Sequence, residues 1–214
     1  MTSPPAARIY TLAMEYLAPP ERRVADGFVL RSYEPGDGAA LADAVNSSYA
    51  HLRRFLPWAV RHTPVEDAEQ RVRSFRAQWL LAQDFVIAAF SSDGATLLGG
   101  SGYHLREGGL ATRNAEIGMW VRADAARCGL GTRMLLELLE WGFGAWPWER
   151  LTWRCDPQNT ASVRVAEKAG LVLEGTLRSH VLDARGRRRD TLCYAALRGS
   201  WSHPRERGSR DEGS

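Results

Sequence analysis

The sequence predicts a single α/β domain in which helices flank a mixed β-sheet. The 214 residues show no internal repeat, and 44% are hydrophobic against 25% charged, which are the proportions of a globular protein. Strand-like runs come first and strand–helix–strand units follow, a pattern typical of a mixed sheet. We expect the domain to span residues 27–201, with a flexible extension over 1–26 and a flexible, charged tail over 202–214.

The first half of the chain is predicted to hold four strands and two helices. One helix is expected over residues 37–49, where apolar residues follow helical spacing. The second is expected to begin with Thr63 as its N-cap, Pro64 at its first position and Glu66 at its third. Apolar runs bounded by turn residues predict strands over 28–31, 85–90, 96–104 and 114–121.

The second half is predicted to add two helices, a strand and a final hairpin. The helices are expected over residues 131–142 and 160–169, with the strand over 150–155 between them. The hairpin is expected to pair residues 171–174 with 191–197 across an arginine-rich connection.

Composition excludes several classes of protein. The cysteines Cys128, Cys155 and Cys193 are widely spaced and the five histidines are scattered, so neither disulfides nor a metal site are expected. The start of the chain lacks the features of a secretory signal, and no apolar run approaches the roughly 20 residues of a membrane span. We therefore expect a cytoplasmic protein with no membrane partner. The net charge is +3 and the pI about 9.0, but the arginine-rich run 185–189 accompanies no nucleic-acid-binding motif, so no direct nucleic-acid partner is expected.

A glycine-containing turn follows the strand that ends near residue 121. Gly129 and Gly131 open the next helix, whose first amides have no partner within the helix and suit a pyrophosphate. The same glycines would equally serve a tight turn for packing. Met134 stands where a Rossmann turn needs its third glycine, and no lysine follows as in a P-loop, so both of those nucleotide sites are disfavoured.

A second motif stands about thirty residues further on. Asn159 and Ser162 form an Asn-x-x-Ser at the start of a helix, where Asn159 is also well placed simply to cap it. The Gly-x-Gly helix, the strand, the Asn-x-x-Ser helix and the Glu-Lys-x-Gly-hydrophobe run at 167–171 together resemble the acetyl-CoA-binding core of the GCN5-related N-acetyltransferases (GNAT). Within that superfamily the chain is most similar to the RimJ/RimL branch of ribosomal-protein N-acetyltransferases, over residues 28–201.

The resemblance implies a GNAT-type, mostly antiparallel sheet and acetyl-CoA as co-substrate, with no metal. It also implies that strand backbone binds the pantetheine arm, that the glycine turn wraps the pyrophosphate, and that the Asn-x-x-Ser motif lies near the thioester. Ala126 occupies the position where the family has a polar residue, so either Arg127 supplies that charge from a shifted position or the backbone amides suffice. The cofactor-binding residues implied are Met119, Trp120, Val121, Arg127, Cys128, Gly129, Leu130, Gly131, Thr132, Asn159 and Ser162.

Two residues are candidates for catalysis by the same resemblance. Glu116 is the candidate base, acting directly or through water on the attacking amine; its structural alternative is a strand glutamate that faces solvent or an arginine. Ser162 is the candidate hydrogen-bond donor to the departing CoA thiolate; its alternative is an ordinary residue of a first helical turn. An α-amine, with an ordinary pKa of about 7.7–8.0, demands less of the base than a lysine at about 10.4.

The expected activity is transfer of an acetyl group from acetyl-CoA to a primary amine, by direct attack in a ternary complex. A protein N-terminus is the favoured acceptor; small-molecule amines, a protein lysine, succinyl-CoA as donor and a non-catalytic CoA-binding protein stay open. Cys128 at a helix start also leaves open a covalent acyl-thiol route. The aromatic group His51, Phe55, Trp58 and Trp79 either shapes the acceptor groove or packs in the core. The paired final strands are compatible with a homodimer.

Overall fold

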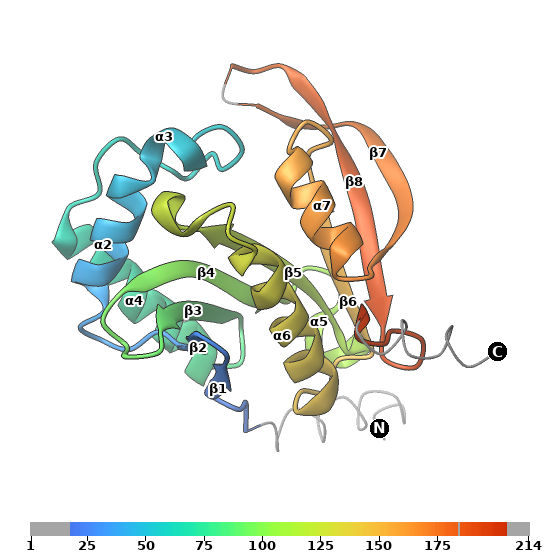
Figure 1. Ribbon diagram of the computed structural model, residues 1–214, viewed down its shortest axis with the longest axis horizontal. Helices are drawn as coiled ribbons and strands as arrows, with labels where there is room; N and C mark the ends of the chain where they lie inside the picture. The colour runs from blue at the N-terminus through green and yellow to red at the C-terminus, as the bar shows by residue number, and fades with distance from the viewer. Residues whose placement is uncertain (1–17, 184, 205–214) are drawn as a thin grey trace, which may run out of the picture.

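The computed structural model describes residues 18–183 and 185–204, and within them eight strands form one sheet in the order β1-β2-β3-β4-β5-β6-β8-β7 (Figure 1). The strands are β1 Arg22–Ala25, β2 Phe28–Ser32, β3 Phe85–Ser91, β4 Leu97–His104, β5 Asn114–Val121, β6 Arg150–Cys155, β7 Val172–Leu182 and β8 Arg188–Leu197. The helices are α2 Gly38–Ser47, α3 Tyr49–Leu52, α4 Val65–Leu80, α5 Gly109–Thr112, α6 Leu130–Gly144 and α7 Thr160–Lys168, with a 3₁₀ turn at Ala123–Ala125.

The sheet is mixed and mostly antiparallel, as predicted. Every neighbouring pair is antiparallel except β5 and β6, which run parallel. Helix α6 supplies the crossover between these two strands and crosses the sheet in front of β5 in Figure 1. A parallel connection needs such a crossover, because its strands run in the same direction.

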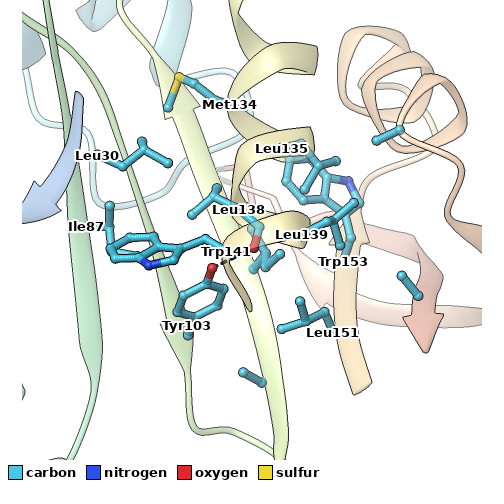
Figure 2. Close-up of a cluster of buried hydrophobic side chains, with 14 of the residues drawn as sticks. Leu30, Ile87, Tyr103, Met134, Leu135, Leu138, Leu139, Trp141, Leu151 and Trp153 are labelled. Carbon is cyan, nitrogen blue, oxygen red and sulfur yellow. Dashed lines mark hydrogen bonds between the residues drawn. The ribbon is translucent and has the colours of Figure 1, made fainter. Parts of the chain in front are cut away.

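Helices cover both faces of the sheet, and β3 makes this visible. Its side chains alternate between two buried clusters: Phe85 and Ile87 pack in one, Ala88 and Phe90 in the other. The first cluster contains the apolar side of α6, and Figure 2 shows Leu138 of this helix toward Ile87 and Tyr103 of the sheet. The second contains side chains of α2 and α4.

Tryptophans gather at the C-terminal end of α6. Trp141, Trp146 and Trp148 are each at most 3% exposed, and the rings of Trp146 and Trp148 stack with centroids 5.9 Å apart. The guanidinium of Arg198, just beyond β8, donates hydrogen bonds to the carbonyls of Phe143, Trp146 (2.6 Å) and Trp148 (2.9 Å). One arginine therefore ties the end of β8 to the loop that follows α6.

Three features differ from the sequence predictions. Helix α4 has Pro64 as its N-cap, so the prediction of Thr63 is wrong; the amide of Asn46 instead holds the backbone N–H and carbonyl of Thr63. The final hairpin is much longer than predicted. Strand β7 is exposed along its length and carries little apolar alternation, so its sequence does not show the pattern from which a strand is predicted. Strand β1 pairs with β2 inside the stretch expected to be a flexible extension, whereas residues 1–17 lie outside the described residues.

Within the described residues, none of the helices is long and apolar enough to cross a membrane.

Candidate active site

The sheet opens at its centre, where β5 and β6 separate. The two strands pair only over Asn114, Ala115 and Glu116, opposite the first three residues of β6. A cavity of about 770 Å³ lies at this fork, lined by both strands, by α2 and α4, and by the start of α7. Because its lining takes Met119 from one face of β5 and Trp120 from the other, the cavity passes through the sheet.

Glu116 is the last residue of β5 that pairs with β6, and it stands at this fork. Its side chain is only 5% exposed, and Arg106 donates a hydrogen bond to Oε1. The second oxygen, Oε2, is buried, lies 3.6 Å from Nε of Arg154, and accepts no hydrogen bond from the described part of the chain. The carboxylate thus faces arginines rather than solvent, and Glu116 belongs to the lining of the cavity.

Sequence analysis missed a histidine–carboxylate pair on the same cavity. His104 ends β4 and lies directly opposite Glu116, and both oxygens of Asp84 lie within 3.1 Å of its Nδ1. The glycines at alternate positions of β4, Gly100 and Gly102, are the signal that could have found it, because glycine in a strand often marks a close approach.

The aromatic residues expected near the acceptor divide between groove and core. Phe55 and Trp58 line the cavity, and the ring of Trp58 meets that of Trp120 edge-on at 6.1 Å. Trp79 is 1% exposed and packs in the core, and His51 is exposed outside the cavity lining. Two of the four residues therefore line the cavity and one packs in the core, and a role in binding the acceptor stays a prediction.

The Asn-x-x-Ser motif reaches the cavity from α7. Oδ1 of Asn159 accepts a hydrogen bond from the backbone N–H of Ser162 at 3.2 Å, so Asn159 does cap the helix. Both residues line the cavity beside Cys155. Burial raises the pKa of the Cys155 thiol, an effect partly offset by its hydrogen bond with Ser162.

The glycine turn lies next to the cavity rather than in its lining. Gly129 is the N-cap of α6 with φ +82°, a conformation that favours glycine, and Arg127 is also left-handed at φ +64°. A Cβ placed on Gly131 would lie 3.7 Å from side-chain atoms of both Met119 and Val121, so the turn abuts β5. The predicted residues that line the cavity are Glu116, Met119, Trp120, Asn159 and Ser162; those outside its lining are Val121, Arg127, Cys128, Gly129, Leu130, Gly131 and Thr132.

Cys128 is exposed, and its thiol donates a hydrogen bond to the carbonyl of Ala125 at 3.0 Å. Its position outside the cavity lining gives the acyl-thiol route no support.

The sequence matches the acetyltransferase (GNAT) domain family over residues 28–172. The chain belongs to the GNAT family. No curated protein matches its sequence.

Solved structures share the GNAT fold. RimL, a ribosomal L7/L12 alpha-N-protein acetyltransferase in complex with coenzyme A, has a TM-score of 0.74 at 21% identity, over 83% of this chain and 98% of that chain. The ribosomal-protein-S5-alanine acetyltransferase of Vibrio fischeri has a TM-score of 0.74 at 16% identity, over 86% and 100%. The microcin C7 self-immunity acetyltransferase MccE, in complex with acetyl-CoA and AMP, has a TM-score of 0.73 at 18% identity, over 85% and 98%.

GNAT enzymes use acetyl-CoA as co-substrate, and two features of this chain fit that molecule. Beyond Glu116, none of the described strands pairs with the edge of β5 that faces β6, so an extended arm bearing amide groups can pair there. The first turn of α6 presents backbone amides that suit a pyrophosphate. Among the residues described, no group of three or more His, Cys, Asp or Glu side chains could hold a metal ion.

Proposed function

We propose that this GNAT enzyme acetylates the α-amine at a protein N-terminus, as a RimJ/RimL-like acetyltransferase. The observation that carries the proposal is the buried carboxylate of Glu116, placed at the fork between β5 and β6 on a cavity that extends under α2 and α4. The fork suits the thioester, and the part of the cavity under the helices has room for the first residues of a peptide. A cytoplasmic location and a homodimer, both expected from the sequence, belong to the same proposal.

The co-substrate would lie along β5 and the turn after it. Backbone groups of residues 119–121 would pair with the pantetheine arm, and the amides of residues 128–132 would surround the pyrophosphate, with the charge of Arg127 nearby. The contact of Gly131 with Met119 and Val121 supports this path, because it joins the turn to the strand edge.

Chemistry would be direct attack of the neutral amine on the thioester carbonyl. The negative charge of Glu116 would attract the acceptor ammonium, and its carboxylate would take a proton from it, directly or through water. Ser162, in the first turn of α7, would donate a hydrogen bond to the sulfur that leaves with CoA. The nitrogen gives up two protons in all, and one of them ends on the CoA thiol.

Two observations favour an α-amine as acceptor. An α-amine is partly neutral near pH 7, whereas a lysine is almost wholly charged, so one buried carboxylate serves the first better. RimL and the ribosomal-protein-S5-alanine acetyltransferase, both similar in fold, carry names that describe protein acceptors.

A small-molecule amine is the second candidate acceptor. The edge-on pair of Trp58 and Trp120 lines the cavity, with Arg71 also in its lining, and such a surface suits a compact aromatic or anionic molecule. The microcin self-immunity acetyltransferase is similar in fold.

The experiment is thiol release from acetyl-CoA with a panel of amines. The panel holds peptides that begin with Ser or Ala, lysine peptides with blocked N-termini, polyamines and amine antibiotics, each repeated with succinyl-CoA. Release with free peptide N-termini alone supports the proposal, and release with small amines alone supports the second candidate. Binding of acetyl-CoA with no release for any acceptor contradicts both.

A further inference from the structure

Asp84 and His104 form a hydrogen-bonded pair beside the fork. Asp84, just before β3, places its two carboxylate oxygens 3.1 and 2.9 Å from Nδ1 of His104, and the backbone N–H of Phe85 donates to Oδ1 at 3.1 Å. A carboxylate only accepts hydrogen bonds, so Nδ1 of the ring carries the hydrogen. The other ring nitrogen, Nε2, is then an acceptor when the imidazole is neutral. This is how a carboxylate fixes the tautomer of a histidine that acts as a base.

The imidazole lies over two glycines, and these fix its direction. A Cβ on Gly102 would lie 2.9 Å from its Cε1, and a Cβ on Gly118 would lie 3.0 Å from its Nε2. Gly102 and Gly118 are opposite each other in β4 and β5, and the next pair on the same face of the sheet, two residues along, is His104 with Glu116. The Nε2 edge of the ring therefore lies over Gly118 of β5, away from Asp84, and both His104 and Gly118 line the cavity.

His104 and Glu116 are direct neighbours. Residues directly opposite in antiparallel strands have Cβ atoms about 4.5–5.5 Å apart, so one water or one amine nitrogen can touch both side chains. The charged groups that line the cavity with the histidine are Asp84 before β3, Glu116 of β5, Arg106 after β4, Arg154 of β6, Asp156 after β6 and Arg71 of α4. Arg106 and Arg154 contact Glu116, whereas Asp84 contacts His104.

We propose that His104, positioned by Asp84, takes up the proton that Glu116 removes from the acceptor ammonium. This inference rests on the function proposed above. An N–H bond of the ammonium breaks, and the proton moves through Glu116 or an intervening water to Nε2 of His104 and then to solvent. The nitrogen forms its bond to the acetyl carbon, the C–S bond breaks with its electron pair on sulfur, and the second nitrogen proton ends on that sulfur.

The ordinary chemistry of the two side chains favours this order. A carboxylic acid with a pKa of about 4.3 holds the proton of an amine poorly, whereas an imidazole with a pKa of about 6.5 holds it much better and still releases it near neutral pH. Glu116 therefore attracts the ammonium by its negative charge, and His104 is the better acceptor for the proton.

The test compares His104→Gln, His104→Ala, Asp84→Asn and Glu116→Gln with wild type, using the best amine of the panel. We expect His104→Gln to lower kcat about a hundredfold, while the KM for the amine changes less than about threefold. Free imidazole is expected to restore His104→Ala about tenfold, because the deleted ring leaves space above the glycines. His62→Gln, at an exposed histidine outside the cavity lining, is the matched control and is expected to turn over like wild type.

Asp84 is a positioning residue, so its variant needs a different signature. In Asp84→Asn the amide would donate to Nδ1, which puts the hydrogen on Nε2 and removes the acceptor from the cavity. We expect kcat to fall as in His104→Gln, with no rescue by imidazole because the ring still fills its site. The KM for the amine should again change less than about threefold in both variants, so the loss falls on kcat.

Three results bear directly on the inference. If the groups act in one relay, the double variant of His104→Gln and Glu116→Gln is no slower than the slower single variant, and this supports it. Near-wild-type kcat in His104→Gln, or a failure of imidazole to restore a folded His104→Ala that still binds acetyl-CoA, overturns it. A wild-type enzyme inactive with every amine overturns the proposed function instead.

Discussion

Replacing Gly118 with alanine tests whether the position of the His104 ring governs turnover. A Cβ at Gly118 would lie 3.0 Å from Nε2 and 3.1 Å from Cδ2 of the imidazole. Ordinary contacts are about 3.5–4.0 Å, so the ring must move by roughly 0.5 Å, at a cost of about 0.5–1.5 kcal/mol. Alanine regains about 0.5–1 kcal/mol over glycine within a strand, so the free energy of unfolding should change by less than about 1 kcal/mol.

Turnover should respond far more than stability. A shift of roughly 0.5 Å in a proton-accepting group is expected to lower kcat about tenfold, given that 1 Å can cost about a hundredfold. Steady-state CoA release gives kcat, and urea unfolding gives the stability of the same preparation. Gly144→Ala is the matched control, since a Cβ at this exposed helical position meets nothing within 4 Å; it should leave kcat unchanged and stabilise by up to about 1 kcal/mol.

A double variant identifies the cause of the loss. Once His104→Ala has removed the ring, Gly118→Ala should have no further effect on kcat. A tenfold loss that persists in that background would mean that the new methyl group acts on the substrate and not on the histidine. Wild-type kcat in Gly118→Ala would refute the reasoning outright.

Three further predictions concern stability and pH. Arg198→Met should lower the free energy of unfolding by about 2–4 kcal/mol, because three backbone carbonyls lose a charged donor. Urea unfolding measures this loss, and Arg188→Met, at an exposed position, is the control whose change in the free energy of unfolding should be near zero. Asn159→Ala should cost about 1 kcal/mol through loss of the α7 cap, whereas Asn159→Asp should retain it in thermal unfolding. The backbone N–H of Arg187, helped by its guanidinium, lowers the pKa of Asp183 from 3.8 to about 2, so this carboxylate stabilises the hairpin above about pH 4 and ceases to do so as the pH falls toward 2. In a carboxyl NMR titration, Arg187→Gln should move that pKa part of the way back.

Local patterns predicted most of the elements because local chemistry decides them. The strand at Phe28 follows a short apolar run and the helix that begins at Leu130 follows a glycine cap, and both signals are visible in a few neighbouring residues. Thr63 shows where such reasoning fails. The side-chain amide of Asn46, seventeen residues earlier, binds the backbone of Thr63, and Pro64 is the N-cap of the helix instead.

The candidate site was predictable only where motifs carry it. Glu116, Asn159 and Ser162 stand in recognisable sequence surroundings, and the structure brings all three to one cavity. Asp84 and His104 meet because Phe85 pairs with Tyr103 across β3 and β4, a register that no local pattern states. The arginines that hold Glu116 come from two further segments for the same reason.

The short ladder between β5 and β6 has a mechanical consequence. The sheet consists of two parts, β1 to β5 and β6-β8-β7, and only three residue pairs join their backbones. A co-substrate lying along β5 and reaching α7 would link the two parts of the sheet where β5 and β6 separate. We therefore expect acetyl-CoA to slow hydrogen exchange in β6 and β8, including at residues that it does not contact. Departure of CoA should leave the two parts of the sheet freer to move against each other.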